Sequence, residues 1–185
     1  MKLDIIRKRR INIADMEELF LKALLWIDNI APQDDYLDLL HEIYLQPENK
    51  DNQDFLELED YTNSKAETYH VLFRIIHSEQ STWNEDLFNK LVTEYLLRRY
   101  NENKSVKDTT KVGLILWSNL PIPYEKRYLS NLSLLINAEE YMDEHSYLLY
   151  HAYKDFFDCI YYYSDETEKE AALNKALKDD HITDT

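Results

Sequence analysis

The chain has 185 residues, a formal net charge of −15, a single cysteine and a single glycine. This length is enough for one domain with a sizeable core, and a hydrophobic content of 44% excludes a disordered chain despite the high charge. Because Gly113 is the only glycine, the chain lacks the residues that primed hairpin turns and phosphate-binding loops need, which argues against an all-β fold, a dinucleotide-binding βαβ unit and a P-loop.

Cysteine usage and hydropathy predict the compartment. With Cys159 alone, no intrachain disulfide can form, and a reducing compartment is the natural interpretation. The basic N-terminal residues are not followed by the apolar run of a secretory signal, and no apolar run is long enough to span a bilayer. The sequence therefore predicts a soluble cytoplasmic protein that does not bind membranes.

The charge is unevenly distributed. Five of the 21 basic residues lie in the first ten positions, and we interpret residues 1–14 as a basic N-terminal arm. The remaining chain carries 16 basic and 35 acidic residues. A field of this sign repels nucleic-acid phosphates and attracts basic molecules, so we expect a basic protein partner and no direct contact with nucleic acid.

Apolar periodicity predicts a first helix over residues 16–30 and a second over residues 34–45. Asp15 and Glu18 form a capping signature before the first helix, which is apolar on nearly every side. A helix of this kind is either central to the core or shared with a second subunit. The polar, acidic stretch over residues 48–63 is expected to be a loop with one short helical turn.

Six further helices follow from the same periodicity, over residues 64–78, 83–100, 109–120, 124–142, 143–163 and 166–178. Capping residues are expected at Ser64, Thr82, Asp143 and Asp165, and residues 101–108 are expected to form a connection.

The helix over residues 143–163 has the broadest apolar stripe, so the other helices are expected to pack around it. The middle of the stripe is formed by Leu149, Tyr153, Phe156, Ile160 and Tyr163. Tyr147 and Tyr162 lie off the stripe. They either cover the stems of neighbouring side chains or contact a partner, because tyrosine is enriched in interfaces.

These elements predict an all-α fold, with a single domain of seven or eight antiparallel helices over residues 15–178 and a frayed acidic tail over residues 179–185. A helical bundle and a short α-solenoid-like stack both remain open, since no repeating residue signature distinguishes them.

Catalytic motifs are weak. Glu67 and His70 form an E-x-x-H pair, and Asp38 and His41 form its aspartate analogue, but a di-iron bundle needs further inward-facing glutamates. No nucleophile elbow, electropositive cysteine or glycine-built oxyanion loop is present. We therefore expect a non-enzymatic protein with no cofactor, and the alternative is a metal-dependent helical-bundle enzyme that uses His41 and His70.

The strongest local signal is an acidic stretch. Between Asp28 and Glu67, 12 acidic residues stand against Lys50 and Lys65, with aromatic residues interleaved. Acids with aromatic anchors are typical of surfaces that capture basic proteins, and the alternative is a merely solvated surface. The residues expected at this interface are Asp34, Asp35, Tyr36, Asp38, Glu57, Glu59, Asp60 and Tyr61.

The leading hypothesis is thus an acidic helical module that holds or inhibits a basic protein. An immunity protein that neutralises a toxin, or an inhibitor of a nucleic-acid-binding protein, would be specific forms of it. The alternative suggested by the apolar helix over residues 16–30 is a self-associating structural or regulatory protein, such as a homodimer.

Overall fold

The computed structural model describes residues 14–47, 49, 52–78, 83–119, 131–142 and 146–182. All regular structure in these ranges is helical, which confirms the all-α prediction. The basic arm before residue 14 lies outside the described residues, as do the predicted caps Thr82 and Asp143 and the first part of the helix expected over residues 124–142. No helix in the described ranges combines the length and apolarity needed to cross a bilayer.

Contacts between Cα atoms divide the chain into two compact units, with the boundary between Asn84 and Glu85. The helices of the first unit are α1 (Ala14–Ile27), α2 (Asp34–Tyr44), α3 (Gln53–Asp60) and α4 (Lys65–Ile76). Those of the second are α5 (Glu85–Asn103), α6 (Val106–Ser118), the 3-10 helix η1 (Asn131–Ser133), α8 (Leu134–Tyr141), α9 (Ser146–Ile160) and α10 (Glu166–Asp179).

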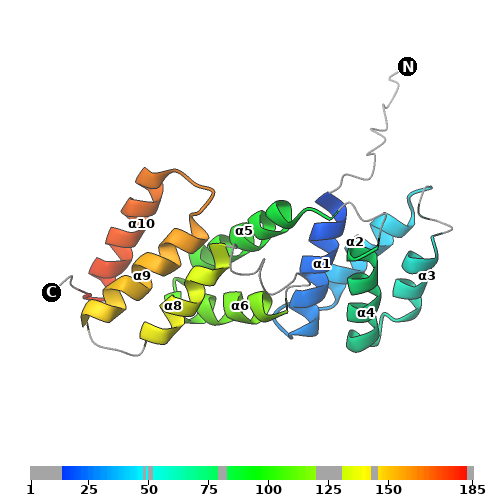
Figure 1. The fold of residues 1–185 in the computed structure, drawn as a ribbon, viewed down its shortest axis with the longest axis horizontal. Coiled ribbons are helices and arrows are strands. Elements are labelled where there is room, and N and C mark those ends of the chain that lie inside the picture. Colours follow the sequence, from blue (N-terminus) through cyan, green and yellow to red (C-terminus); the bar gives the residue numbers. More distant parts are fainter. Residues whose placement is uncertain are drawn as a thin grey trace, which may run out of the picture. The chain divides into compact units, whose positions relative to one another are not determined.

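The first unit is a closed group of four helices (Figure 1), because α1 packs against α2 and α4, and α3 also packs against α2 and α4. The ring of Trp26 in α1 stacks on that of Tyr36 in α2, with centroids 5.4 Å apart, and Phe20 contacts Tyr69 of α4 at 6.2 Å. The buried apolar side chains of α1 are Leu19, Phe20, Leu21, Ala23, Leu24, Leu25 and Trp26. Helix α1 is therefore a core helix of this unit.

The structure replaces the expected single turn in the acidic stretch with α3, a helix of eight residues. The side chain of Asn52 caps it by accepting a hydrogen bond from the Asp54 backbone amide at 2.9 Å. Phe55 and Leu58, three residues apart on one face, are buried. These two anchors and the cap are sufficient to explain the extra helix, which brings the number of α-helices in the described ranges to nine.

In the second unit, α9 lies between α8 and α10 (Figure 1) and also contacts α5, α6 and η1. The prediction that the other helices pack around it therefore holds within this unit only, because α1 to α4 pack against one another in the first unit. Tyr153, Phe156 and Ile160 of the predicted stripe are buried. Tyr163 differs from the prediction and is 44% exposed, because α9 ends at Ile160 and the stripe ends with it.

The boundary between α5 and α6 also differs from the prediction. Helix α5 continues to Asn103, so the connection consists of Lys104 and Ser105 rather than residues 101–108. Lys104 adopts a left-handed conformation with φ of 56°, as do Asn29 and His181 after other helices. Ser105 is the N-cap of α6 and accepts from the Asp108 amide at 3.2 Å.

Gly113 lies in α6, where this helix packs against α5 and α8. A Cβ atom at this position would overlap Cδ1 of Leu135 and come within 3.1 Å of Cδ1 of Leu96. Both leucines are fully buried. The only glycine of the chain therefore serves a close approach between helices rather than a turn.

A buried polar chain joins η1 to α5 and α9. The Asn131 amide donates to Thr93 Oγ1 at 2.8 Å and to the Cys159 carbonyl at 3.4 Å, and the Thr93 hydroxyl donates to the Asn89 carbonyl at 2.7 Å. Such a chain stabilises one arrangement, because any other leaves buried polar groups unpaired.

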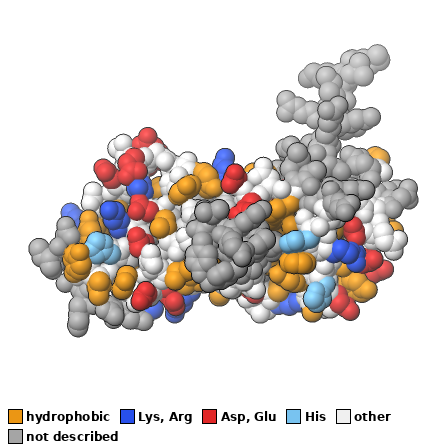
Figure 2. All heavy atoms as spheres, viewed as in Figure 1, with side chains coloured by type: hydrophobic (Ala, Val, Ile, Leu, Met, Phe, Trp, Pro, Cys, Tyr) orange, Lys and Arg blue, Asp and Glu red, His pale blue; other side chains and the backbone are white. Residues whose placement is uncertain are grey.

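Helix α10 begins where predicted, with Asp165 as a cap that accepts from the Thr167 amide at 2.8 Å. Figure 2 shows acidic side chains gathered over α10 towards this end, where they complement the helix dipole. At the other end, the Tyr153 hydroxyl of α9 donates to Asp180 at 2.7 Å. Within the expected frayed tail, Asp179 still belongs to α10, and residues 183–185 lie outside the described residues.

Candidate functional site

The outer face of α2 is the most distinctive exposed surface of the first unit. Asp34, Asp38 and Glu42 follow one another at intervals of four residues, and all three side chains are exposed. This spacing places them in a row along one face, about 12 Å long. Leu45 follows three residues later and is 63% exposed, the highest value among the large hydrophobic side chains of the described residues. We call these four residues the acidic row.

Two open hollows flank the acidic row, and Asp38 and Glu42 line both of them. The hollow on the α1 side measures about 300 Å³ and is completed by Glu18, Lys22, Leu39, Ile43 and Gln46. The hollow on the α3 side measures about 530 Å³ and is completed by Leu37, His41, Glu59 and Thr62. Asp38 and Glu42 therefore form a ridge between two depressions, and each depression has three acidic side chains in its lining.

The charges in the hollows are only partly compensated. Lys22 Nζ lies 3.7 Å from the Glu18 carboxylate, and His41 Nδ1 lies 4.0 Å from that of Glu59. Asp38 and Glu42 form no ion pair within the described part of the chain. These two carboxylates are thus available to a cation from outside.

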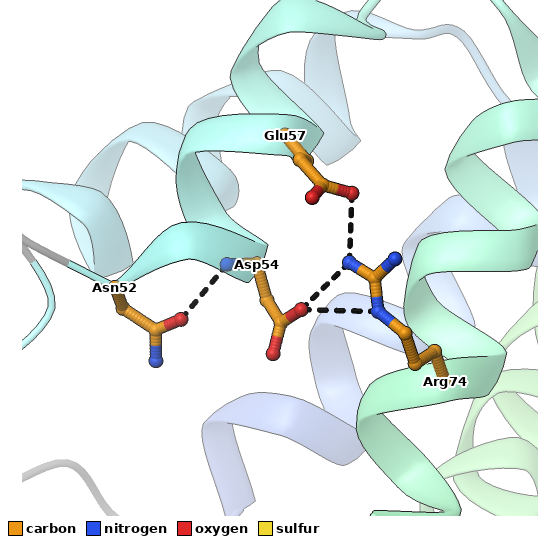
Figure 3. Close-up of polar contacts among 4 residues, drawn as sticks. All are labelled: Asn52, Asp54, Glu57 and Arg74. Carbon is orange, nitrogen blue, oxygen red and sulfur yellow. Dashed lines mark hydrogen bonds and ion pairs between the residues drawn. The ribbon is translucent and has the colours of Figure 1, made fainter.

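Glu57, which the sequence placed at the interface, is already paired. The Arg74 guanidinium of α4 lies between Asp54 and Glu57 of α3, 2.7 Å from an oxygen of each (Figure 3). The hydrogen bonds to Glu57 and then to Asp54 raise the pKa of Arg74. Figure 2 likewise shows acidic side chains beside Lys or Arg over α3 and α4. The role of Glu57 is therefore to hold α3 against α4.

Tyr36 also differs from the prediction, because its side chain is fully buried against Trp26. Burial raises the pKa of its hydroxyl well above the usual range. Tyr61 is half-buried, and its carbonyl accepts from the Thr68 hydroxyl at 3.1 Å. Neither tyrosine is the exposed aromatic anchor that the sequence suggested, and Leu45 is the large apolar side chain that stands out beside the acids.

The remaining predicted residues separate into two groups. Asp38 and Glu59 meet at the hollow on the α3 side. Asp34, Asp35 and Asp60 are exposed but line neither hollow. Sequence reasoning missed Glu42 and Leu45, although the interval of four residues from Asp34 through Asp38 to Glu42 could have identified the row.

The candidate metal ligands do not gather. His41 and His70 are both exposed, and the His70 ring lies edge-on to Tyr69, with centroids 6.3 Å apart. Among the described residues, no group of three or more His, Cys, Asp or Glu side chains could hold a metal ion. Cys159 is buried, which raises the pKa of its thiol and disfavours the thiolate.

The chain matches no protein-family model, no curated protein and no solved structure. The candidate site therefore depends on the geometry and charge of α2 and its neighbours.

Proposed function

We propose that this chain is a non-enzymatic acidic helical protein that captures a basic protein partner in the cytoplasm. The observation that carries the proposal is the acidic row, in which Asp38 and Glu42 are exposed, without ion pairs in the described residues, and placed between two hollows. Exposed Leu45 at the end of the row supplies an apolar contact.

Charge and apolar area make different contributions to such a contact. A net charge of −15 accelerates the encounter with a basic protein at low ionic strength, and unpaired carboxylates orient it. The apolar side chain of Leu45, at the end of the row, adds affinity when the partner buries it. A partner whose own function is to bind nucleic acid or to act as a toxin fits this chemistry, which makes an inhibitor or an immunity protein the specific form that we favour.

The two alternatives lack a supporting observation of this kind. Self-association was suggested by the apolar first helix, but the apolar side chains of α1 from Leu19 to Trp26 are buried within one copy of the chain. A metal-dependent enzyme was suggested by His41 and His70, which belong to no cluster of ligands among the described residues.

The test is an affinity pull-down from native cell lysate at low and high salt, read by mass spectrometry. We compare the natural chain with the double substitution Asp38→Lys and Glu42→Lys. A matched control, Glu139→Lys and Glu140→Lys, changes the net charge equally at two exposed positions of α8. We expect one basic protein to be retained at low salt by the natural chain and the control, and to be lost at high salt or with the α2 variant.

Two outcomes would contradict the proposal. Equal loss of the partner with both variants would mean that only the overall charge matters. Recovery of the bait alone, with a dimeric mass by light scattering, would favour the self-associating protein instead.

A further inference from the structure

The outer face of α2 also indicates what kind of element the partner presents. Along this face, the acidic side chains of Asp34, Asp38 and Glu42 occupy successive turns of α2, and the apolar side chain of Leu45 follows the last of them. The distance along the axis from Asp34 to Leu45 is about 16 Å, or three helical turns. A docking element must therefore supply positive charge over one part of its length and an apolar side chain beyond it.

Backbone chemistry favours a helix over an extended segment as that element. The peptide groups in the interior of α2 are hydrogen-bonded within the helix, so they cannot pair with a strand added from outside. An extended segment would therefore gain no backbone hydrogen bonds from this surface, and its peptide groups would stay hydrogen-bonded to water. A helix satisfies its backbone internally and needs only side-chain contacts with this surface.

The two hollows agree with this geometry. They lie on opposite sides of the ridge formed by Asp38 and Glu42, so a helix along the ridge places flanking side chains in both. Long lysine or arginine stems can lie against Leu37 and Leu39 in the walls while their charged ends reach Glu18 or Glu59.

The order of charge along α2 also selects a direction. Asp34 and Asp35 lie in the first turn of α2, and Leu45 lies at its C-terminal end. Basic residues are most favourable near the C-terminus of a helix. An antiparallel helix with its basic turns at the C-terminal end meets the acids, and its apolar N-terminal turn meets Leu45.

We propose that the acidic row of α2 docks an antiparallel amphipathic helix of the partner, apolar in its first turns and basic in its last. This inference rests on the proposed function and adds the structural class and the direction of the bound element.

The test uses three synthetic peptides of about 18 residues, long enough to form measurable helix. The first is alanine-rich, with a leucine near its amino end and three lysines at intervals of four residues on the same face towards its carboxyl end. The second has the same composition with the lysines distributed over three faces. The third reverses the order, with the lysines first and the leucine last.

Binding is measured by fluorescence anisotropy with the full chain at low salt, and helix formation by circular dichroism. We expect the first peptide to bind about tenfold more tightly than either of the others, and to gain helicity on binding. The substitutions Asp38→Lys and Glu42→Lys should abolish this preference, Leu45→Ala should weaken it, and Glu139→Lys with Glu140→Lys should leave it unchanged.

Equal affinity for all three peptides would overturn the inference. The proposed function would still stand in that case if the pull-down captured a basic protein through α2. Equal affinity for the first and third peptides alone would overturn the antiparallel direction. If no peptide binds and no basic protein is captured, the inference and the proposed function both fail.

Discussion

Gly113→Ala tests the close packing of α6 against α5 and α8. In an unconstrained helix interior, replacing glycine by alanine gains about 1 kcal/mol of stability. Here the added methyl group overlaps Leu135 Cδ1 and comes within 3.1 Å of Leu96 Cδ1, whereas carbon atoms pack at about 3.5–4 Å. Overpacking a filled core costs about 1–3 kcal/mol, and both leucines are fully buried. We expect the two effects to leave a net loss of about 1 kcal/mol.

The assay is urea unfolding followed by circular dichroism, with the transition of the second unit fitted separately if the two units unfold apart. Ala171→Gly, at an exposed position inside α10, is the matched control that reports the alanine preference without the steric contact. In a double-mutant cycle, Leu135→Ala removes the overlapping atom, so Gly113→Ala should become neutral or stabilising in that background. A stabilising Gly113→Ala in the natural chain, or strict additivity with Leu135→Ala, would refute the steric reasoning.

Tyr153→Phe removes the hydrogen bond to Asp180 and should cost about 1 kcal/mol in urea unfolding; an unchanged midpoint would contradict this. Burial raises the pKa of Tyr36 and Tyr153 and raises that of Tyr100 to about 12. As the pH rises, these tyrosines therefore lose their protons at a lower pH in the unfolded chain than in the folded chain. Stability should therefore be full below about pH 10 and fall as the pH rises towards 12, and a flat unfolding midpoint between those values would argue against it. The buried thiol of Cys159 should react with a soluble thiol reagent only as fast as the protein opens, whereas rapid labelling in native buffer would show that it is accessible.

Tyr162→Phe serves as a control for the tyrosine predictions, because Tyr162 is 60% exposed. Its substitution should leave the unfolding midpoint unchanged.

Local signals in the sequence were sufficient for most helices, because their apolar faces and caps lie close together along the chain. Asp165 caps α10 as predicted. Ser64 occupies the predicted N-cap of α4, but its side chain forms no capping hydrogen bond. The sequence predicts that α6 starts at residue 109, yet Thr109 is buried inside that helix and Ser105 is the cap. Sequence periodicity did not identify Ser105 as a cap, because the chain reverses at a single left-handed residue, Lys104, that the sequence does not mark.

The candidate site was only partly accessible from sequence, because charge and aromatic content do not reveal which side chains are already occupied. Tyr36 looked like an exposed anchor but is needed in the core against Trp26. Glu57 looked free but is paired with Arg74, which lies 17 residues further along the chain. Tertiary packing decided both cases. The row from Asp34 through Asp38 to Glu42 depends only on helical spacing, so it was readable from the sequence.

The left-handed residues at the ends of helices mark positions where a substitution could raise the free energy of unfolding. With its only glycine inside α6, the chain gives positive φ values to Lys104 and His181, whose Cβ atoms crowd the neighbouring carbonyl at a cost of about 1 kcal/mol each. Glycine would relieve this crowding, although part of the gain is lost because glycine also makes the unfolded chain more flexible. At Lys104 the substitution would also remove the hydrogen bond to Asn101 and the contact with the Tyr100 ring, so His181 is the better position. Both positions lie outside the acidic row. The protein could therefore be made more robust at its helix ends without altering the surface that we propose binds the partner.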